Sequence, residues 1–203
     1  MIPSLGDPRI YSLQCVSLKP VEKLHQNPWF SVFSRGGYFT IEDNKPQVIV
    51  LPILENSSVI MVRVCRPVIA DDTLELPAGG MRENESPVEA AIRELSEETG
   101  IHIADANRFC VQEPMVLTTR NPYFHRIFQI NLTQKEFRRR LKHDTEIISV
   151  ECFSFKEALE KIRNNEIYSS FHIALLIRFL IQNKYLVCSN LRRNKRQLEN
   201  REI

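Results

Sequence analysis

Short apolar runs separated by turn residues dominate the first third of the chain and predict β-strands. Residues 47–54 (QVIVLPIL) form an almost unbroken apolar run, which is typical of a strand buried on both faces. The polar segment 55–58 (ENSS) predicts a turn, and residues 59–65 (VIMVRVC) predict the returning strand. The aromatic segment 29–40, which is centred on a glycine pair, predicts a hairpin.

Weaker patterns extend this prediction to the rest of the chain. Residues 9–18 alternate only in part and favour a strand, while Asp71 and Asp72 are predicted to form a loop before a short strand at 73–77. Other predicted strands are 107–117 with a break at Pro114, 123–132 and 147–153, with a loop at 118–122 and a loop or short helix at 134–142. Helical spacing marks 156–164 and 169–184, the latter with a stripe of Ile173, Leu176, Ile177, Leu180 and Ile181.

The clearest helix signals lie between Ser86 and Gly100. Ser86 can cap the free N–H groups, Pro87 suits the first helical position, and Glu89 can close a capping box. Gly100 stands where a left-handed C-terminal cap is expected. The apolar stripe of this helix consists of Val88, Ala91, Ile92 and Leu95. Strands before and after a central helix, with a closing helix, predict an α+β fold, an α/β/α sandwich.

A second face of this helix is acidic. Glu94, Glu97 and Glu98 lie three and four positions apart, and Arg93 is expected to meet only one of them. A solvated acidic face is the simple interpretation. However, a glycine pair at 79–80 precedes the helix and lets backbone approach the same place. Clustered carboxylates facing such a turn suit a hard divalent cation such as Mg²⁺.

The spacing of these residues resembles the signature of the Nudix hydrolases. The matching positions are Gly79, Glu85, Arg93-Glu94-Leu95, Glu97-Glu98 and Gly100-Ile101. The resemblance implies a mixed sheet held between helices. It also implies cleavage of a diphosphate linked to another group, by attack of water on phosphorus, with Mg²⁺ or Mn²⁺ as cofactor.

The same resemblance assigns roles to individual residues. Glu94 and Glu98 would bind the metal, with Glu97 as a third ligand and the carbonyl of Ala78 as a backbone ligand. A bound metal lowers the pKa of its water and neutralises phosphate charge. Arg93 would orient Glu97.

Two further acids are candidates for the same chemistry. Glu85 carries over as a supporting carboxylate. Outside the signature, Glu146 is the candidate acid that helps to activate water, by similarity to the ADP-ribose pyrophosphatases. The alternative for Glu146 and its neighbour Asp144 is that both are ordinary exposed loop acids.

The run VRVCRP followed by DDTLELPAGG resembles the ADP-ribose pyrophosphatase branch of the family. In that branch, N-terminal strands join two chains into a homodimer and aromatic residues hold the adenine. Candidate substrate contacts are Arg63, Arg66, Phe30, Gly79 and Gly80. Surface charge remains the alternative for the two arginines, and hairpin packing for Phe30. The segment TTRNPYFHR departs from the Ser/Gly-rich loop usual in the branch, and the zinc-ribbon cysteines of NADH-cleaving relatives are absent.

Composition limits the classes of binding partner and the cellular location that we expect. The 27 basic and 25 acidic residues give a formal charge of +2, so nucleic-acid binding is not expected, although residues 190–203 form a basic polar tail. Five cysteines without a C-x-x-C pair favour reduced thiols, and neither a secretory signal nor a membrane span is apparent. We therefore expect a cytoplasmic protein with a β-rich extension at 1–46, a Nudix domain at 47–189 and the tail.

Four functional hypotheses follow. The first is a hydrolase that splits ADP-ribose or a related nucleoside diphosphate sugar into a nucleoside monophosphate and a sugar phosphate. The alternatives are a pool-cleaning nucleoside triphosphate pyrophosphatase and a catalytically silent nucleotide-binding module. Cleavage of capped RNA with help from the basic tail is a further possibility.

Overall fold

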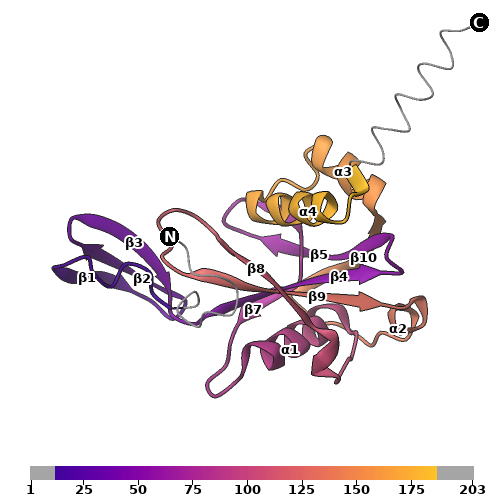
Figure 1. Cartoon of the computed structure of the whole chain (residues 1–203), viewed down its shortest axis with the longest axis horizontal. Helices are drawn as coiled ribbons and strands as arrows, with labels where there is room; N and C mark the ends of the chain where they lie inside the picture. The colour runs from indigo at the N-terminus through magenta and orange to yellow at the C-terminus, as the bar shows by residue number, and fades with distance from the viewer. Residues whose placement is uncertain (1–11, 187–203) are drawn as a thin grey trace, which may run out of the picture.

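A computed structural model describes residues 12–186 and arranges them in two β-sheets with four α-helices (Figure 1). The smaller sheet has the order β1-β2-β3, formed by Val21–Gln26, Phe30–Arg35 and Tyr38–Asp43. Its second turn lies at the glycine pair, where Gly36 and Gly37 have φ of 56° and 87°. The predicted hairpin is therefore confirmed.

The segment before this sheet differs from the prediction. Residues 12–18 form turns rather than a strand, and the remainder of the predicted strand lies outside the described residues. The N–H of Leu18 donates to the carbonyl of Cys15 at 3.1 Å, which closes a turn. The first strand starts only after Pro20, so this weakly alternating segment enters no sheet.

The larger sheet has seven strands. These are β4 (Gln47–Leu54), β5 (Ser58–Arg66), β6 (Asp71–Glu75), β7 (Ala78–Gly80), β8 (Cys110–Val116), β9 (Phe124–Leu132) and β10 (Ile147–Ser154). The main order is β10-β5-β4-β9-β8, while β6 pairs with β5 and β7 with β4. Because β4 and β9 run parallel and the other pairs antiparallel, the sheet is mixed, as predicted.

Strand β6 begins two residues earlier than the sequence suggested. Asp71 and Asp72 were expected in a loop, but they pair with Arg66 and Cys65 of β5. Pairing across the hairpin thus overrides the low strand propensity of aspartate. Strand β8 shows the expected irregularity, with a register shift between Gln112 and Met115 that brackets Pro114.

Helices cover both faces of the larger sheet. Helix α1 (Pro87–Thr99) lies on one face, and α3 (Phe155–Arg163) and α4 (Ser170–Gln182) lie on the other (Figure 1). The short α2 (Gln134–Arg138) follows β9. The chain is therefore an α+β protein built as an α/β/α sandwich. None of the described helices is both long and apolar enough to cross a bilayer.

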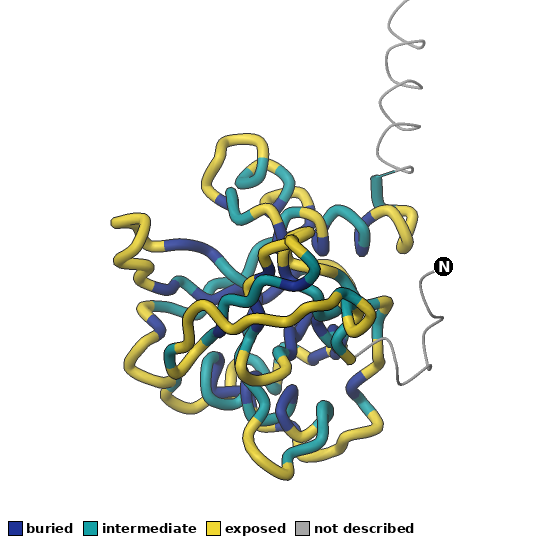
Figure 2. The backbone as a smooth tube through the Cα atoms, turned by 90° about the vertical axis from the view of Figure 1, so that its left-hand side faces the viewer, coloured by how far each residue is buried: buried dark blue, intermediate teal, exposed yellow. Residues whose placement is uncertain are grey.

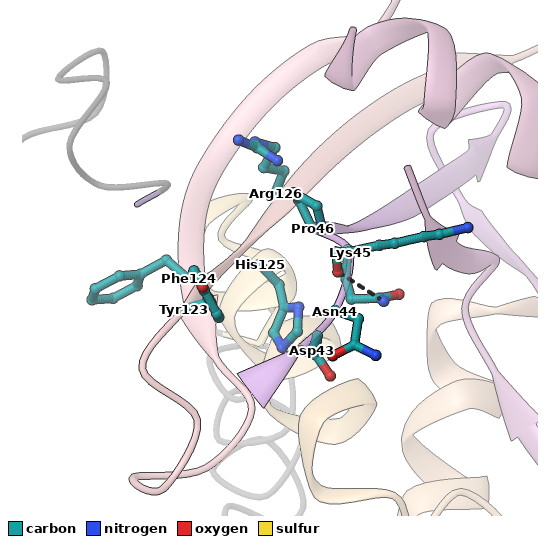
Figure 3. A pocket seen from close by; sticks show the side chains of 9 residues that line it. Asp43, Asn44, Lys45, Pro46, Tyr123, Phe124, His125 and Arg126 are labelled. Atoms are coloured by element: carbon teal, nitrogen blue, oxygen red, sulfur yellow. Dashed lines mark hydrogen bonds between the residues drawn. The ribbon is translucent and has the colours of Figure 1, made fainter. Parts of the chain in front are cut away.

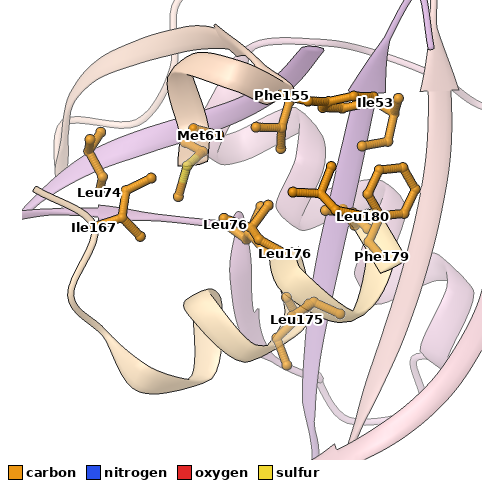
Figure 4. Close-up of a cluster of buried hydrophobic side chains, with 14 of the residues drawn as sticks. Ile53, Met61, Leu74, Leu76, Phe155, Ile167, Leu175, Leu176, Phe179 and Leu180 are labelled. Carbon is orange, nitrogen blue, oxygen red and sulfur yellow. The ribbon is translucent and has the colours of Figure 1, made fainter. Parts of the chain in front are cut away.

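Strand β4 explains why two helical layers are needed. Its Ile49, Leu51 and Ile53 belong to the core cluster that includes α4, and Figure 4 shows Ile53 beside Leu180 and Phe179. Val48 and Val50 pack in the cluster that includes α1. All five are at most 5% exposed, and the buried segments run through the centre of the molecule (Figure 2). Each such side chain contributes about 1.5–3 kcal/mol when buried, so neither face can remain open to solvent.

The apolar stripe of α4 was only partly predicted. Leu176 and Leu180 are buried as expected, but Ile181 is 53% exposed and Leu175 and Phe179 take its place in the core. The helix is apolar on most of its surface, so its sequence does not define which side faces the sheet.

Candidate active site

Helix α1 begins and ends where its local sequence requires. Ser86 and Glu89 form the predicted capping box, and Gly100 adopts the left-handed conformation with φ of 71°. A Cβ on Gly100 would lie 2.1 Å from the carbonyl oxygen of Leu141, so only glycine fits there. The loop between α2 and β10 is tied to this helix end, since the N–H of Asp144 donates to the carbonyl of Glu97 at 2.8 Å.

Glu94 lies directly against the backbone of β7. It is only 7% exposed, and a Cβ added to Gly79 would come within 2.2 Å of its Oε1. Burial raises the pKa of Glu94, although its contact with Arg93 acts in the opposite direction. The glycine therefore makes room for a carboxylate rather than for a turn.

Glu98 is the second carboxylate on this side of the helix. The N–H of Ala78 donates to its Oε2 at 3.1 Å. Burial, together with the nearby charge of Glu94, raises the pKa of Glu98 to about 8. Such a shift means that the negative charge at this position lacks a sufficient counter-charge.

Arg93 connects the acidic side chains. It donates to both oxygens of Glu85 at 2.7 and 2.9 Å, to Glu94 at 2.6 Å and to Glu97 at 2.9 Å. It also donates to the carbonyl of Gly80 at 2.9 Å. The expectation that Arg93 meets only one acid of the helix was wrong, because its five N–H donors serve several partners at once. Hydrogen bonds from Arg93 lower the pKa of Glu85.

Sequence reasoning missed Arg82 as a partner of this cluster. Its Nη2 donates to Glu97 at 2.8 Å, and its backbone N–H donates to Glu85 at 2.7 Å. The arginine side chain is 62% exposed and lies in the loop between β7 and α1. A lone loop arginine carries no signal by itself, but its closeness to the signature acids could have marked it.

The donor set fits a hard divalent cation. Four carboxylates face two guanidinium groups here, and carboxylate oxygens are the ligands that Mg²⁺ and Mn²⁺ prefer. Within residues 12–186, no three His, Cys, Asp or Glu side chains already converge as metal ligands.

Arg66 lies near the cluster, but it is held by a residue that sequence analysis did not single out. Its Nε and Nη2 donate to Glu75 at 2.8 and 2.7 Å. The charges of Glu98 and Glu146 both act on Arg66. Glu146 itself is exposed, in the turn that precedes β10. The structure thus places Arg66 within electrostatic reach of both Glu98 and Glu146.

Two candidate substrate residues lie elsewhere. Arg63 is paired with Glu151 of β10 at 2.7 Å, and it also donates to the carbonyl of Asp72 at 3.3 Å. Phe30 belongs to the smaller sheet, where its ring centroid lies 6.2 Å from that of His25. The structure gives neither side chain a contact with the carboxylate cluster.

A separate pocket of about 90 Å³ lies where β4 and β9 begin (Figure 3). His125 points into it toward Asp43 and Asn44, and its Nε2 has no hydrogen-bond partner among the described residues. Burial lowers the pKa of His125. None of the signature carboxylates lines this pocket, so it is separate from the candidate site on α1.

Comparison with known proteins agrees with this geometry. The model of the NUDIX domain matches residues 43–172, which is more than half of the chain. The chain belongs to the Nudix family. A crystal structure described as an ADP compounds hydrolase has the same fold, with a TM-score of 0.60 and 17% identity over 85% of this chain and 97% of that one.

Among the relatives of this Nudix chain, the ADP-ribose pyrophosphatase of Bacillus subtilis is 27% identical over 61% of this chain. The methanol dehydrogenase activator of Bacillus methanolicus is 30% identical over the same share. The ADP-sugar pyrophosphatase of the mouse is 46% identical over 26%. The matches span 65% of each bacterial relative and 26% of the mouse protein, less than two thirds of their lengths.

Proposed function

We propose that this Nudix chain is a metal-dependent hydrolase that cleaves ADP-ribose or a related nucleoside diphosphate sugar into a nucleoside monophosphate and a sugar phosphate. The observation that carries the proposal is the pair of acidic side chains, Glu94 and Glu98, packed against β7 with raised pKa values. Buried like charges are retained only where a counter-charge stabilises them. Relatives described as ADP-ribose and ADP-sugar pyrophosphatases support the substrate class.

Glu94 and Glu98 would hold Mg²⁺ or Mn²⁺, with Glu97 and the carbonyl of Ala78 as further ligands. When bound, the metal supplies a water of lowered pKa and neutralises charge on the diphosphate. Arg93 keeps Glu97 and Glu85 in place through the contacts described above. Gly79 makes room for the Glu94 carboxylate, and the backbone at Gly79 and Gly80 would contact the substrate beside it.

The substrate contacts follow from the free donors near the cluster. Arg66 uses Nε and Nη2 for Glu75, and its Nη1 has no hydrogen-bond partner among the described residues. This N–H₂ group would bind the diphosphate, since guanidinium groups recognise phosphate oxygens well. Glu146 would accept the proton that the attacking water loses. Arg63, engaged by Glu151, is the weaker candidate.

The smaller sheet supports a homodimer. Trp29, Tyr38, Phe39 and Ile41 are all between 47% and 76% exposed on or beside it. Apolar side chains gathered in this way mark association surfaces. A second copy would cover them and bring Phe30 close to a bound adenine. Light scattering after size-exclusion chromatography, on wild type and on a Tyr38→Lys variant, measures whether this surface joins two chains.

A substrate panel tests the proposed reaction. Wild-type protein is assayed with Mg²⁺ against ADP-ribose, other nucleotide sugars and nucleoside triphosphates. We expect ADP-ribose or another nucleotide sugar to be cleaved best, with AMP or the matching monophosphate as product. Preference for triphosphates would identify the pool-cleaning activity instead. Tight nucleotide binding without any hydrolysis would identify a silent binding module.

A further inference from the structure

Glu75 is held from three directions, although it belongs to none of the signature positions. Arg66 binds both of its carboxylate oxygens, and Thr73 donates to its Oε1 at 2.5 Å. The Nε2 of His172 lies 3.5 Å from its Oε2. Its side chain is only 14% exposed. Burial alone would raise the pKa of Glu75, but the donors on Arg66, His172 and Thr73 outweigh it and lower that pKa.

His172 brings α4 into the same network. Its Nδ1 accepts the N–H of Leu76 at 3.3 Å, across 96 positions of the sequence. A neutral imidazole that accepts at Nδ1 carries its proton on Nε2, which here faces Glu75. The residue is 7% exposed and stands among the apolar side chains of the α4 core. One imidazole thus contacts both a carboxylate and the backbone that leads into the signature.

This network lies next to the signature residues. Leu76 precedes Ala78 by two residues, and the N–H of Ala78 binds Glu98. Arg66, which binds Glu75, also interacts electrostatically with Glu98 and Glu146. A free arginine side chain loses rotamer entropy when it binds phosphate. A bidentate contact with a carboxylate fixes the guanidinium before the phosphate arrives, so less entropy is lost on binding. Preorganisation of this kind strengthens binding without adding a contact.

We propose that Glu75 and His172 are positioning residues, which aim Arg66 at the diphosphate and fix the 76–78 backbone beneath Glu98. The inference rests on the proposed function, because it assigns the diphosphate to Arg66. Glu75 contributes by holding Arg66, and His172 by holding both Glu75 and the N–H of Leu76. Neither residue touches the reacting atoms.

A purely structural salt bridge is the competing explanation, and the chain provides a matched control. Arg108 and Glu136 form another two-pronged pair, at 2.5 and 3.2 Å, and Thr133 donates to Glu136 as Thr73 does to Glu75. Glu136 lies in α2, outside the carboxylate cluster. Glu136→Gln should therefore lower stability slightly without disturbing substrate binding.

The test compares Glu75→Gln, His172→Asn, His172→Gln and Glu136→Gln with wild type. For Glu75→Gln we expect KM for the best substrate to rise about tenfold, the loss typical of one charge-assisted hydrogen bond, while kcat changes less than about threefold. Asparagine keeps an acceptor for the N–H of Leu76, so His172→Asn should raise KM only. Glutamine reaches Glu75 but not Leu76, so His172→Gln should lower kcat and spare KM. Glu136→Gln should leave both parameters unchanged.

A double variant and a binding measurement complete the test. Glu75→Gln combined with His172→Asn should be no worse in KM than Glu75→Gln alone, because both act through Arg66. An unchanged or lower KM in Glu75→Gln overturns the proposal, since Glu75 would then be structural or compete with phosphate for Arg66.

The increase in Tm caused by inorganic pyrophosphate with Mg²⁺ is measured on the same proteins. If wild type cleaves no nucleotide sugar, the proposed function fails, and a smaller shift in Glu75→Gln than in Glu136→Gln still supports the positioning role. Equal or absent shifts overturn that role as well.

Discussion

Arg35 and Arg93 are both largely buried arginines, but their surroundings differ in charge. Arg35, in the smaller sheet, faces one carboxylate, and its Nε and Nη2 contact Glu42 at 2.6 and 3.0 Å. The side chains of Arg35 and Glu42 are both less than a tenth exposed. Arg93, on α1, faces Glu85, Glu94 and Glu97 together, and Glu98 stands beside them.

The difference separates a structural ion pair from a site. In the smaller sheet the charges cancel, and Thr40 adds a hydrogen bond to Glu42 at 2.5 Å. On α1 the acids outnumber the bases. Burial raises the pKa values of Glu94 and Glu98, and neighbouring carboxylates add to the rise, Glu97 and Glu85 at Glu94 and Glu94 at Glu98. An excess of buried negative charge is unfavourable unless a bound cation neutralises it. The comparison therefore predicts that the two regions respond differently to the loss of one charge.

The largest effect is expected from Glu98→Gln. The change keeps size and removes one charge from the proposed metal site, so several kcal/mol of transition-state stabilisation are lost. We expect kcat to fall on the order of a thousandfold, about 4 kcal/mol, with the fold retained. Steady-state hydrolysis measures kcat, and circular dichroism measures whether the fold is retained. Glu89→Gln, on the same helix but in its capping box, should remain active, and wild-type rates in Glu98→Gln would contradict the metal assignment.

The balanced pair should respond in stability instead. Glu42→Gln leaves the Arg35 guanidinium buried without its counter-charge, which should cost about 3 kcal/mol of unfolding free energy. Urea denaturation measures this loss. The paired change Arg35→Met with Glu42→Leu removes both charges and should recover most of it. No such recovery of turnover is expected when Arg93 and Glu98 are replaced together, and recovery there would erase the distinction between the two regions.

A smaller effect is expected from Arg93→Lys. Lysine keeps the charge but cannot reproduce the fork that binds both oxygens of Glu85, or reach Glu94 and Glu97 simultaneously. Loss of such support typically reduces metal affinity or activity by about 10–100-fold. The Mn²⁺ concentration for half-maximal hydrolysis should rise accordingly. Arg108→Lys, at a pair without excess acid, should leave that concentration unchanged.

These expectations depend on how much of the molecule local sequence determines. The ends of α1 were predictable because Ser86, Pro87 and Gly100 act through their own backbone. Strands β4 and β5 were predictable because unbroken apolar runs have few alternatives to burial. The resemblance to the Nudix signature then led to the carboxylates of α1.

Contacts between distant segments were not predictable in the same way. Asp71 and Asp72 join a strand only because β5 lies beside them. His172 appears in sequence as one polar residue in an apolar helix, and its contact with Leu76 depends on how α4 crosses the sheet. Arg93 was assigned one acid of the helix because neighbouring positions do not face each other along a helix, yet its guanidinium reaches Glu94 as well as Glu97. Its contacts with Glu85 and Gly80 depend on the path of the preceding loop, which spacing along the helix does not describe.

The smallest effect concerns Arg108 and Glu136, a balanced pair nearer the surface. Arg108 holds the pKa of Glu136 at about 2, below its usual 4.5. Because the folded pKa is the lower one, the stabilisation is complete above the unfolded value and is lost as pH falls through about 2. An ion pair as exposed as this one contributes less than about 1 kcal/mol to the free energy of unfolding.

Urea denaturation at several pH values should therefore show a small stability difference between wild type and Glu136→Gln near neutral pH. That difference should shrink in acid. Glu83→Gln, at an exposed acid before α1, should show no difference at any pH. A gap for Glu136→Gln that stays constant down to pH 2 would mean that its contacts, and not its charge, stabilise the fold. Charge balance would then fail to distinguish this pair from the cluster around Arg93.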